Sequence, residues 1–71
     1  MAVNKSFVFV DGTGCVFFAK RDASEDTWAL HLFKRGHWEY KRPMGEVEVC
    51  FRDSVKLSEG IAQSYHDSDA A

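Results

Sequence analysis

The sequence is poor in the residues that mark secreted, membrane-spanning and nucleic-acid-binding proteins. It holds only two cysteines in 71 residues, too few for the disulfide framework that supports many small secreted domains. The apolar run near its start, Phe7 to Val10, is too short for a signal peptide or a membrane span. Nine Lys/Arg against 11 Asp/Glu give a net charge of −2, whereas nucleic-acid-binding domains are usually strongly basic. These absences predict a cytoplasmic protein without membrane contact.

What is present indicates a small globular protein. Its length predicts one small domain covering residues 1–71, and its 45% hydrophobic content is that of a folded chain. Two Trp, two Tyr and six Phe are more aromatic side chains than so small a core easily hides, so we expect some at the surface or in an interface. Cys15 and Cys50 lie in apolar runs and are interpreted as reduced, buried thiols. A disulfide between them would require the second and fifth strands to be neighbours.

The order of apolar and polar residues predicts five consecutive antiparallel strands. β-branched and aromatic residues alternate with polar ones, or form short apolar runs, over 5–10, 15–20, 28–34, 38–42 and 46–51. The glycines of Asp11–Gly14 predict a turn, and a phosphate-binding Walker loop is excluded because no Gly-Lys-Ser/Thr and no helix follow. Both faces of the first hairpin are apolar, which predicts that it is covered on both sides.

Two turns set the register of the later strands. With Pro43 and Met44 as a two-residue loop, Tyr40 would face Val47 across a hairpin, and Trp38 would face Val49.

The other turn follows Lys34. A three-residue loop, Arg35–His37, would keep Trp28, Leu30 and Leu32 on the same face as Trp38 and Tyr40, and we prefer it. A two-residue loop would instead place Phe33 beside Trp38, opposite the two leucines.

After residue 51 the apolar period changes to that of a helix. A helix near 54–66 is predicted, with Asp53 or Ser54 as N-cap and a frayed tail over 67–71. The alternative is a shorter helix beginning at Ser58, preceded by an extended segment over 55–57. The predicted fold class is therefore α+β: an antiparallel five-stranded meander, as an open sheet or small curled barrel, with a C-terminal helix.

The sharpest local feature of the sequence is a basic and aromatic stretch over residues 34–43. Aromatic rings that stack on bases and cations that meet phosphates are what single-strand binding requires, although an inward-facing Trp38 could not stack. The same residues would suit contact with a protein. The candidate partner-binding residues are Lys34, Arg35, His37, Trp38, Lys41 and Arg42.

A second candidate site follows from the predicted register. On the outward face of the last two predicted strands, His37 would lie near Cys50 and Glu39 opposite Glu48. These residue types bind metals, and opposed carboxylates can form an acid–base pair. An ordinary solvated sheet face has the same composition, and His31 is interpreted as an ordinary strand histidine.

The sequence shows no nucleophile motif, phosphate loop or metal-ligand spacing, so no cofactor or metal is expected. The leading hypothesis is a non-enzymatic protein-binding module that acts as an adaptor or inhibitor of a partner protein, with a homodimer as one way to support so small a core. Interference with a host enzyme by a phage or mobile-element protein would be one version of this function. The second hypothesis is a weak RNA- or single-stranded-DNA-binding protein that uses the 34–43 stretch. The third is a small enzyme or metal site on the face with His37, Glu39, Glu48 and Cys50.

Overall fold

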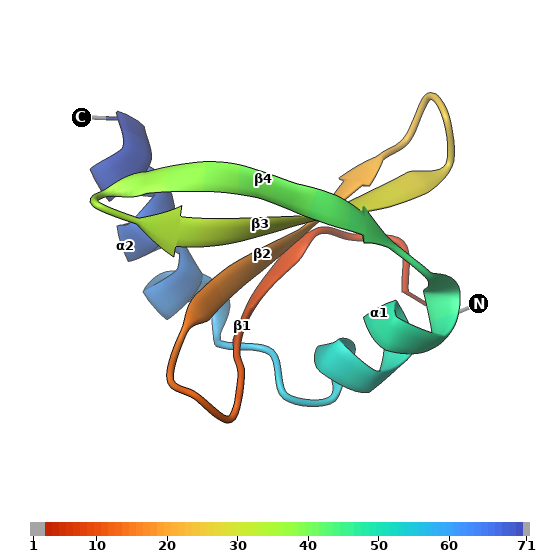
Figure 1. The fold of residues 1–71 in the computed structure, drawn as a ribbon, viewed down its shortest axis with the longest axis horizontal. Coiled ribbons are helices and arrows are strands. Elements are labelled where there is room, and N and C mark those ends of the chain that lie inside the picture. The colour runs from red at the N-terminus through yellow and green to blue at the C-terminus, as the bar shows by residue number, and fades with distance from the viewer. Residues whose placement is uncertain (1–2, 71) are drawn as a thin grey trace.

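The computed structural model describes residues 3–70 and contains one open antiparallel sheet followed by two helices (Figure 1). The four strands are paired in sequence order, and the sheet is therefore a simple meander. The elements are β1 (Phe7–Val10), β2 (Val16–Asp22), β3 (Thr27–Lys34), β4 (His37–Met44), α1 (Glu46–Asp53) and α2 (Glu59–Ala70). The α+β class and the antiparallel sheet are confirmed.

The two helices lie on opposite faces of the sheet and toward opposite ends of it (Figure 1). The face here called the α1 side bears Phe7 and Phe9, which pair across β1 and β2 with Ala19 and Phe17. The face called the α2 side bears Val8, which pairs with Phe18. Because successive strand residues point to opposite faces, the apolar run of the first hairpin supplies both faces at once. Both apolar faces of the hairpin are therefore covered, one by α1 and the other by α2.

The α1 side holds the buried core. Val49 of α1 is fully buried in it, and Arg52 places its guanidinium 5.1 Å from the centre of the Phe9 ring. Phe17 packs at the margin of this core. The buried members are Phe7, Phe9, Ala19, Trp28, Leu30, Met44 and Val49.

The α2 side is held by aromatic rings rather than by aliphatic packing. Tyr65 of α2 meets Phe33 edge-on at 5.0 Å, and His66 meets Phe18 edge-on at 4.7 Å. Trp38 lies between them, 5.3 Å from Phe18 and 5.5 Å from His66. Edge-to-face pairs at these distances are favourable beyond the area they bury.

A short linker carries the chain from one face of the sheet to the other. It runs along the outer edge of β1, where Lys56 forms an antiparallel bridge with Phe9 and the Leu57 N–H donates to the Val8 carbonyl at 2.7 Å (Figure 1). The linker therefore acts as a short, partial extra strand. At the opposite edge, the backbone N–H of Trp38 donates to the Asp69 carboxylate at 3.0 Å, which ties the end of α2 to the start of β4.

The predicted fifth strand is wrong, because residues 46–51 belong to α1. Gly45 ends the strand, and its carbonyl accepts the first helical hydrogen bond, from the Val49 N–H at 3.0 Å. Acidic Glu46 and Glu48 lie in the first turn and basic Arg52 lies in the last, an order that complements the helix dipole. The predicted fold class is corrected accordingly to four strands and two helices.

The predicted turn at Pro43-Met44 is wrong for the same reason as the fifth strand. Both residues lie within β4, where Met44 pairs with Trp28 and is buried. The expected pairings of Tyr40 with Val47 and of Trp38 with Val49 are therefore absent, since both valines lie in α1.

The preferred three-residue loop after Lys34 is also wrong. Lys34 pairs directly with His37, so the loop is Arg35-Gly36, with φ of 54° and 82°. Positive φ at both positions defines a type I′ turn, whose twist suits a hairpin. Phe33 therefore pairs with Trp38. The prediction failed because it assumed one buried face, whereas α1 and α2 cover one face each.

A register shift between Leu30 and His31 adjusts the same hairpin. Leu30 pairs with Arg42 and His31 pairs with Tyr40, which leaves Lys41 as an extra residue in β4. Tyr40 pairs with His31, and its ring meets the His31 ring edge-on at 5.7 Å, but the residue remains 56% exposed.

The start of α2 agrees with the second alternative, a helix that begins near Ser58 and not near residue 54. The carbonyl of Ser58 accepts a hydrogen bond from the Ala62 N–H at 2.9 Å, and the segment before Ser58 is extended, as its bridge to β1 shows. The helix continues through the region predicted as a frayed tail as far as Ala70; residue 71 lies outside the described part. Cys15 and Cys50 are free but exposed, so the expectation of buried thiols is wrong.

Candidate functional site

Three of the six predicted partner-binding residues lie together at the tip of the β3–β4 hairpin, and the other three lie further along β4. Lys34 and Arg35 lie at the tip of the β3–β4 hairpin, which is exposed. His37 follows them, and its Nδ1 lies 3.5 Å from the Asp69 carboxylate. Lys41 occupies the bulge, with its ammonium 3.7 Å from the Glu39 carboxylate.

The remaining two members have structural partners. Trp38 packs in the aromatic cluster beneath α2, so its ring is not free to stack on a base. The two terminal nitrogens of Arg42 donate to the two carboxylate oxygens of Glu48, at 2.7 and 2.6 Å. This paired geometry is the strong form of an arginine–carboxylate contact and joins β4 to α1.

The predicted metal or catalytic face does not form. Glu48 and Cys50 lie in α1, whereas His37 and Glu39 lie in β4, so the expected pairings across a hairpin do not exist. Within residues 3–70, no group of three or more His, Cys, Asp or Glu side chains is arranged to hold a metal ion.

The carboxylates whose pKa differs from its ordinary value have a lowered pKa, so their charged form is favoured. Hydrogen bonds from the Arg42 guanidinium lower the pKa of Glu48, and the Thr13 hydroxyl lowers the pKa of Asp11 in its turn. Burial, with a smaller effect of the Lys20 charge, lowers the pKa of His31. Acid–base catalysis by carboxylates usually needs one pKa to be raised, so these lowered values do not suggest a proton-transfer pair.

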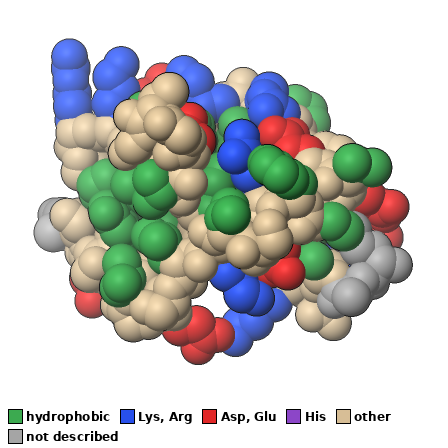
Figure 2. All heavy atoms as spheres, turned by 90° about the horizontal axis from the view of Figure 1, so that it is seen from below, with side chains coloured by type: hydrophobic (Ala, Val, Ile, Leu, Met, Phe, Trp, Pro, Cys, Tyr) green, Lys and Arg blue, Asp and Glu red, His purple; other side chains and the backbone are tan. Residues whose placement is uncertain are grey.

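The outward face of α1 is the most prominent exposed apolar feature of the described chain. Val47 is 86% exposed and Phe51 is 62% exposed, and these two residues are one helical turn apart. Val55, just after the helix, is 47% exposed. Figure 2 views the molecule from the side on which α1 lies and shows hydrophobic side chains at the surface there. We call Val47, Phe51 and Val55 the apolar row.

The helix that carries this row is attached to the sheet by a buried valine and an ion pair. Val49 enters the core from the opposite side of α1, and the Arg42–Glu48 pair fixes its first turn. Arg52 lies 5.2 Å from the Phe51 ring centre while also covering Phe9, so Phe51 is held by its neighbour. The row is therefore presented on a preorganised support.

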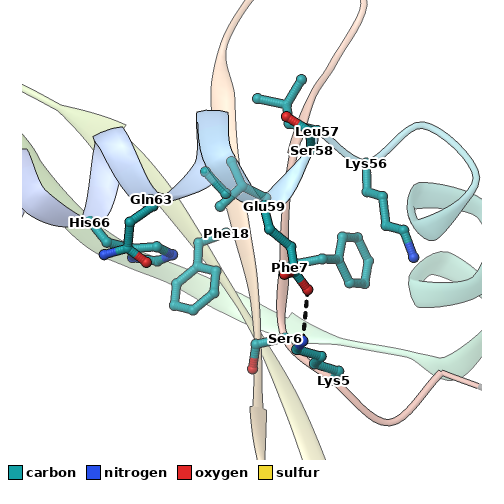
Figure 3. A pocket seen from close by; sticks show the side chains of 12 residues that line it. Lys5, Ser6, Phe7, Phe18, Lys56, Leu57, Ser58, Glu59, Gln63 and His66 are labelled. Atoms are coloured by element: carbon teal, nitrogen blue, oxygen red, sulfur yellow. Dashed lines mark hydrogen bonds and ion pairs between the residues drawn. The ribbon is translucent and has the colours of Figure 1, made fainter.

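A concave feature, here called the β1 groove, lies between the outer edge of β1 and the start of α2 (Figure 3). Its volume is about 570 Å³, within the range of small-ligand and peptide pockets. Phe18 and His66 lie side by side on one wall, and the Lys5–Glu59 ion pair spans the opening at 2.7 Å (Figure 3).

Neither surface was identified from the sequence, although part of the signal was present. Residues 46–53 carry acids in the first turn and a base in the last, which is a helical charge pattern. In a helix, Val47 and Phe51 fall on one face and Val49 on the other, whereas strand alternation places all three together. The β1 groove had no sequence signal, since it depends on where the linker leaves the sheet.

Comparison of the chain with protein-family models, with curated proteins and with solved structures finds no match. Among the described helices, none has the length and apolar character needed to cross a membrane.

Proposed function

We propose that this chain is a non-enzymatic protein-binding module, an adaptor or inhibitor whose binding element is α1. The observation that carries the proposal is the apolar row, above all the exposure of Val47 and Phe51 on one face of α1. Exposed apolar side chains gathered on one element are typical of interaction sites. Helices commonly bind partners by placing apolar residues spaced three or four apart into a groove.

Burial of the row would supply part of the binding energy of a complex. Fully burying a valine or phenylalanine side chain is worth about 1.5–3 kcal/mol. Val47 and Phe51 are already ordered by α1, so their burial requires little further loss of conformational freedom. Glu46 lies in the first turn of the same helix and is exposed, so the partner that fits best has an apolar groove with a basic residue at one end.

The edge of the sheet is a poorer interface than α1. At the free edge of β4, Pro43 lacks an N–H, Lys41 forms a bulge, and the Trp38 N–H is already bonded to Asp69. Proline, bulges and lysine are devices that protect an edge strand from pairing with another chain. A partner is therefore expected to seat on α1 rather than extend the sheet beyond β4.

The compartment we propose is the cytoplasm. The reason is that Cys15 and Cys50 are free, exposed thiols, which persist best where the surroundings are reducing.

The test is an affinity capture from lysate of the source organism, with nuclease present throughout. The baits are the wild-type chain, the double variant Val47→Ser/Phe51→Ser, and Ile61→Ser as a matched control, because Ile61 is a 52% exposed residue of α2. We expect one stoichiometric protein to bind the wild type and the control but not the double variant.

Two results would contradict the proposal: equal recovery on all three baits, or recovery that depends on nucleic acid. Light scattering of the purified proteins is run in parallel. A wild-type dimer that becomes a monomer in the double variant would identify the partner as a second copy of the chain.

A further inference from the structure

The β1 groove combines apolar walls with a charged opening (Figure 3). It is lined by Val8 and Phe18 of the sheet, by Leu57 of the linker and by Ala62 of α2. On one wall the Phe18 and His66 rings meet edge-on, with their centres 4.7 Å apart (Figure 3). Aromatic rings pack favourably in edge-to-face and offset arrangements, so this wall suits a further ring. The groove therefore fits a ligand that carries an aromatic group.

The opening of the groove carries charges of both signs. The Lys5 ammonium lies 2.7 Å from the Glu59 carboxylate, and this pair spans the opening (Figure 3). Lys56 also lines the groove, with its ammonium 3.1 Å from the Asp53 carboxylate. The side chains of Lys5 and Glu59 are 78% and 85% exposed, so water competes for both charges and the pair separates readily. A ligand can displace this contact if it gives each charge a new partner.

A zwitterion meets this condition better than a ligand of one charge. An anion bound to Lys5 would take that partner from Glu59 and place a like charge beside it. A cation bound to Glu59 would do the same to Lys5. A zwitterion supplies a carboxylate for Lys5 and an ammonium for Glu59, so one exposed ion pair becomes two. In an α-amino acid both groups are attached to one carbon, and the side chain extends away from them.

We propose that the β1 groove binds a free aromatic α-amino acid. Its carboxylate contacts Lys5, its ammonium contacts Glu59, and its ring enters the groove against Phe18 and His66. Small-ligand sites usually have this design, in which apolar walls hold the ligand and a few polar groups fix its orientation.

The proposal goes beyond the protein-binding function above and uses no residue of α1. The groove lies on the α2 side of the sheet, whereas α1 covers the other face, so each site can fail in experiment without the other (Figure 1). A bound amino acid would contact both the sheet and α2. It should therefore slow amide hydrogen exchange in α2, because a ligand stabilises the state that binds it.

The test is an NMR titration of the ¹⁵N-labelled full chain with L-phenylalanine, 3-phenylpropionate and phenethylamine. The last two probes keep the aromatic ring but lack the ammonium and the carboxylate, respectively. We expect L-phenylalanine to cause saturable shifts at amides of residues 5–8 and 57–66. Each probe of a single charge should bind at least tenfold more weakly.

Two substitutions separate the contribution of the ring from that of the charges. Ala62→Phe fills the groove and should weaken L-phenylalanine binding at least tenfold, whereas Ser64→Phe, on the exposed face of α2, should change it less than twofold. Glu59→Gln removes the partner of the ammonium and should weaken L-phenylalanine at least fivefold without weakening 3-phenylpropionate. The Glu59 side chain is 85% exposed, so this variant keeps the proposal testable if Ala62→Phe fails to fold.

The proposal is overturned if L-phenylalanine gives no saturable shifts, or if either probe of a single charge binds as tightly. It is also overturned if Glu59→Gln, or a folded Ala62→Phe, leaves the affinity for L-phenylalanine unchanged. Val47→Ser/Phe51→Ser should bind L-phenylalanine as the wild type does, and loss of binding in this variant would assign the ligand to α1 instead. Retained L-phenylalanine binding by that variant, together with loss of the captured protein, separates the two sites.

Discussion

Val47 and Val49 show how much the placement of single residues determines in this protein. They are two positions apart in α1, yet Val47 is 86% exposed and Val49 is fully buried. Val49→Ala should lower the free energy of unfolding by about 2–3 kcal/mol, because it removes buried methyl groups and leaves a cavity. Val47→Ala should change it by less than about 0.5 kcal/mol, as exposed substitutions usually do. Urea unfolding of the two variants measures both values.

The same pair tests the helix itself. If residues 46–51 formed a strand, both valines would lie on one face and both substitutions would have similar effects. Equal losses of stability would therefore contradict the assignment of α1.

The ion pair between Arg42 and Glu48 makes stability depend on pH. The Arg42 hydrogen bonds hold the pKa of Glu48 below its ordinary value of 4.5 in the folded protein, so the unfolded chain binds the proton more readily. The stabilisation is thus complete above pH 4.5 and is lost as the pH falls through the folded pKa. Glu48→Gln should lower stability by about 0.5–1 kcal/mol at pH 7, since the pair is partly exposed.

Urea unfolding between pH 2 and pH 7 measures this effect. The difference between wild type and Glu48→Gln should shrink toward zero at the acid end. Glu46→Gln removes the other acid of the first turn and serves as the control. A difference between wild type and Glu48→Gln that stays constant across the range would show that the Arg42 contact is not responsible.

Among the elements, the β3–β4 hairpin carries backbone strain in its turn. Arg35 has a φ of 54°, a conformation that asparagine and glycine adopt more easily than arginine. Arg35→Asn should therefore raise the free energy of unfolding by up to about 1 kcal/mol. Gly36→Ala, at a φ of 82°, should lower it by about 1 kcal/mol or more.

Thermal unfolding of both variants checks the turn. A three-residue loop would not require positive φ at both positions. If Arg35→Asn has no effect and Gly36→Ala is tolerated, the type I′ turn is contradicted.

The elements also show what the sequence could and could not predict. The first four predicted strands overlap β1 to β4 because short apolar runs bounded by glycine, or by charged loops, are strong local signals. Residues 46–51 were misassigned because Val47, Val49 and Phe51 alternate as in a strand. Only tertiary packing shows that one of the three is buried and two are not.

The sequence predicted the candidate site less well than the fold. The basic and aromatic stretch stood out by composition, but composition does not reveal that Trp38 packs beneath α2 or that Arg42 is paired with Glu48. Both facts depend on helices that follow later in the chain. The wrong register of the β3–β4 hairpin had the same origin. Because helices cover both faces of the sheet, apolar residues lie on both sides of each strand and do not show which residues pair.

For the whole molecule, the arrangement of the helices implies unequal local stability. β2 and β3 are paired on both sides, whereas α2 is attached through aromatic contacts on one face and the Trp38–Asp69 bond. Hydrogen exchange followed by NMR should give the slowest amides in β2 and β3 and faster exchange in α2. Tyr65→Ala should speed exchange in α2 further while leaving α1 unchanged. Equal protection of α2 and β3 in the wild type would contradict this order.

The linker along β1 has a consequence for how copies of the chain can meet. The contacts that α2 makes with the sheet are intramolecular only because residues 54–58 bring the helix back onto its own β1. If the Val8–Leu57 bond and the Phe9–Lys56 bridge open together, the helix can leave its own sheet and dock on the same face of a neighbour. Such domain exchange recovers every lost contact, so its equilibrium depends on concentration and on the hinge alone. The pairing of the linker with β1 is thus the hinge at which an exchange of α2 between copies would begin.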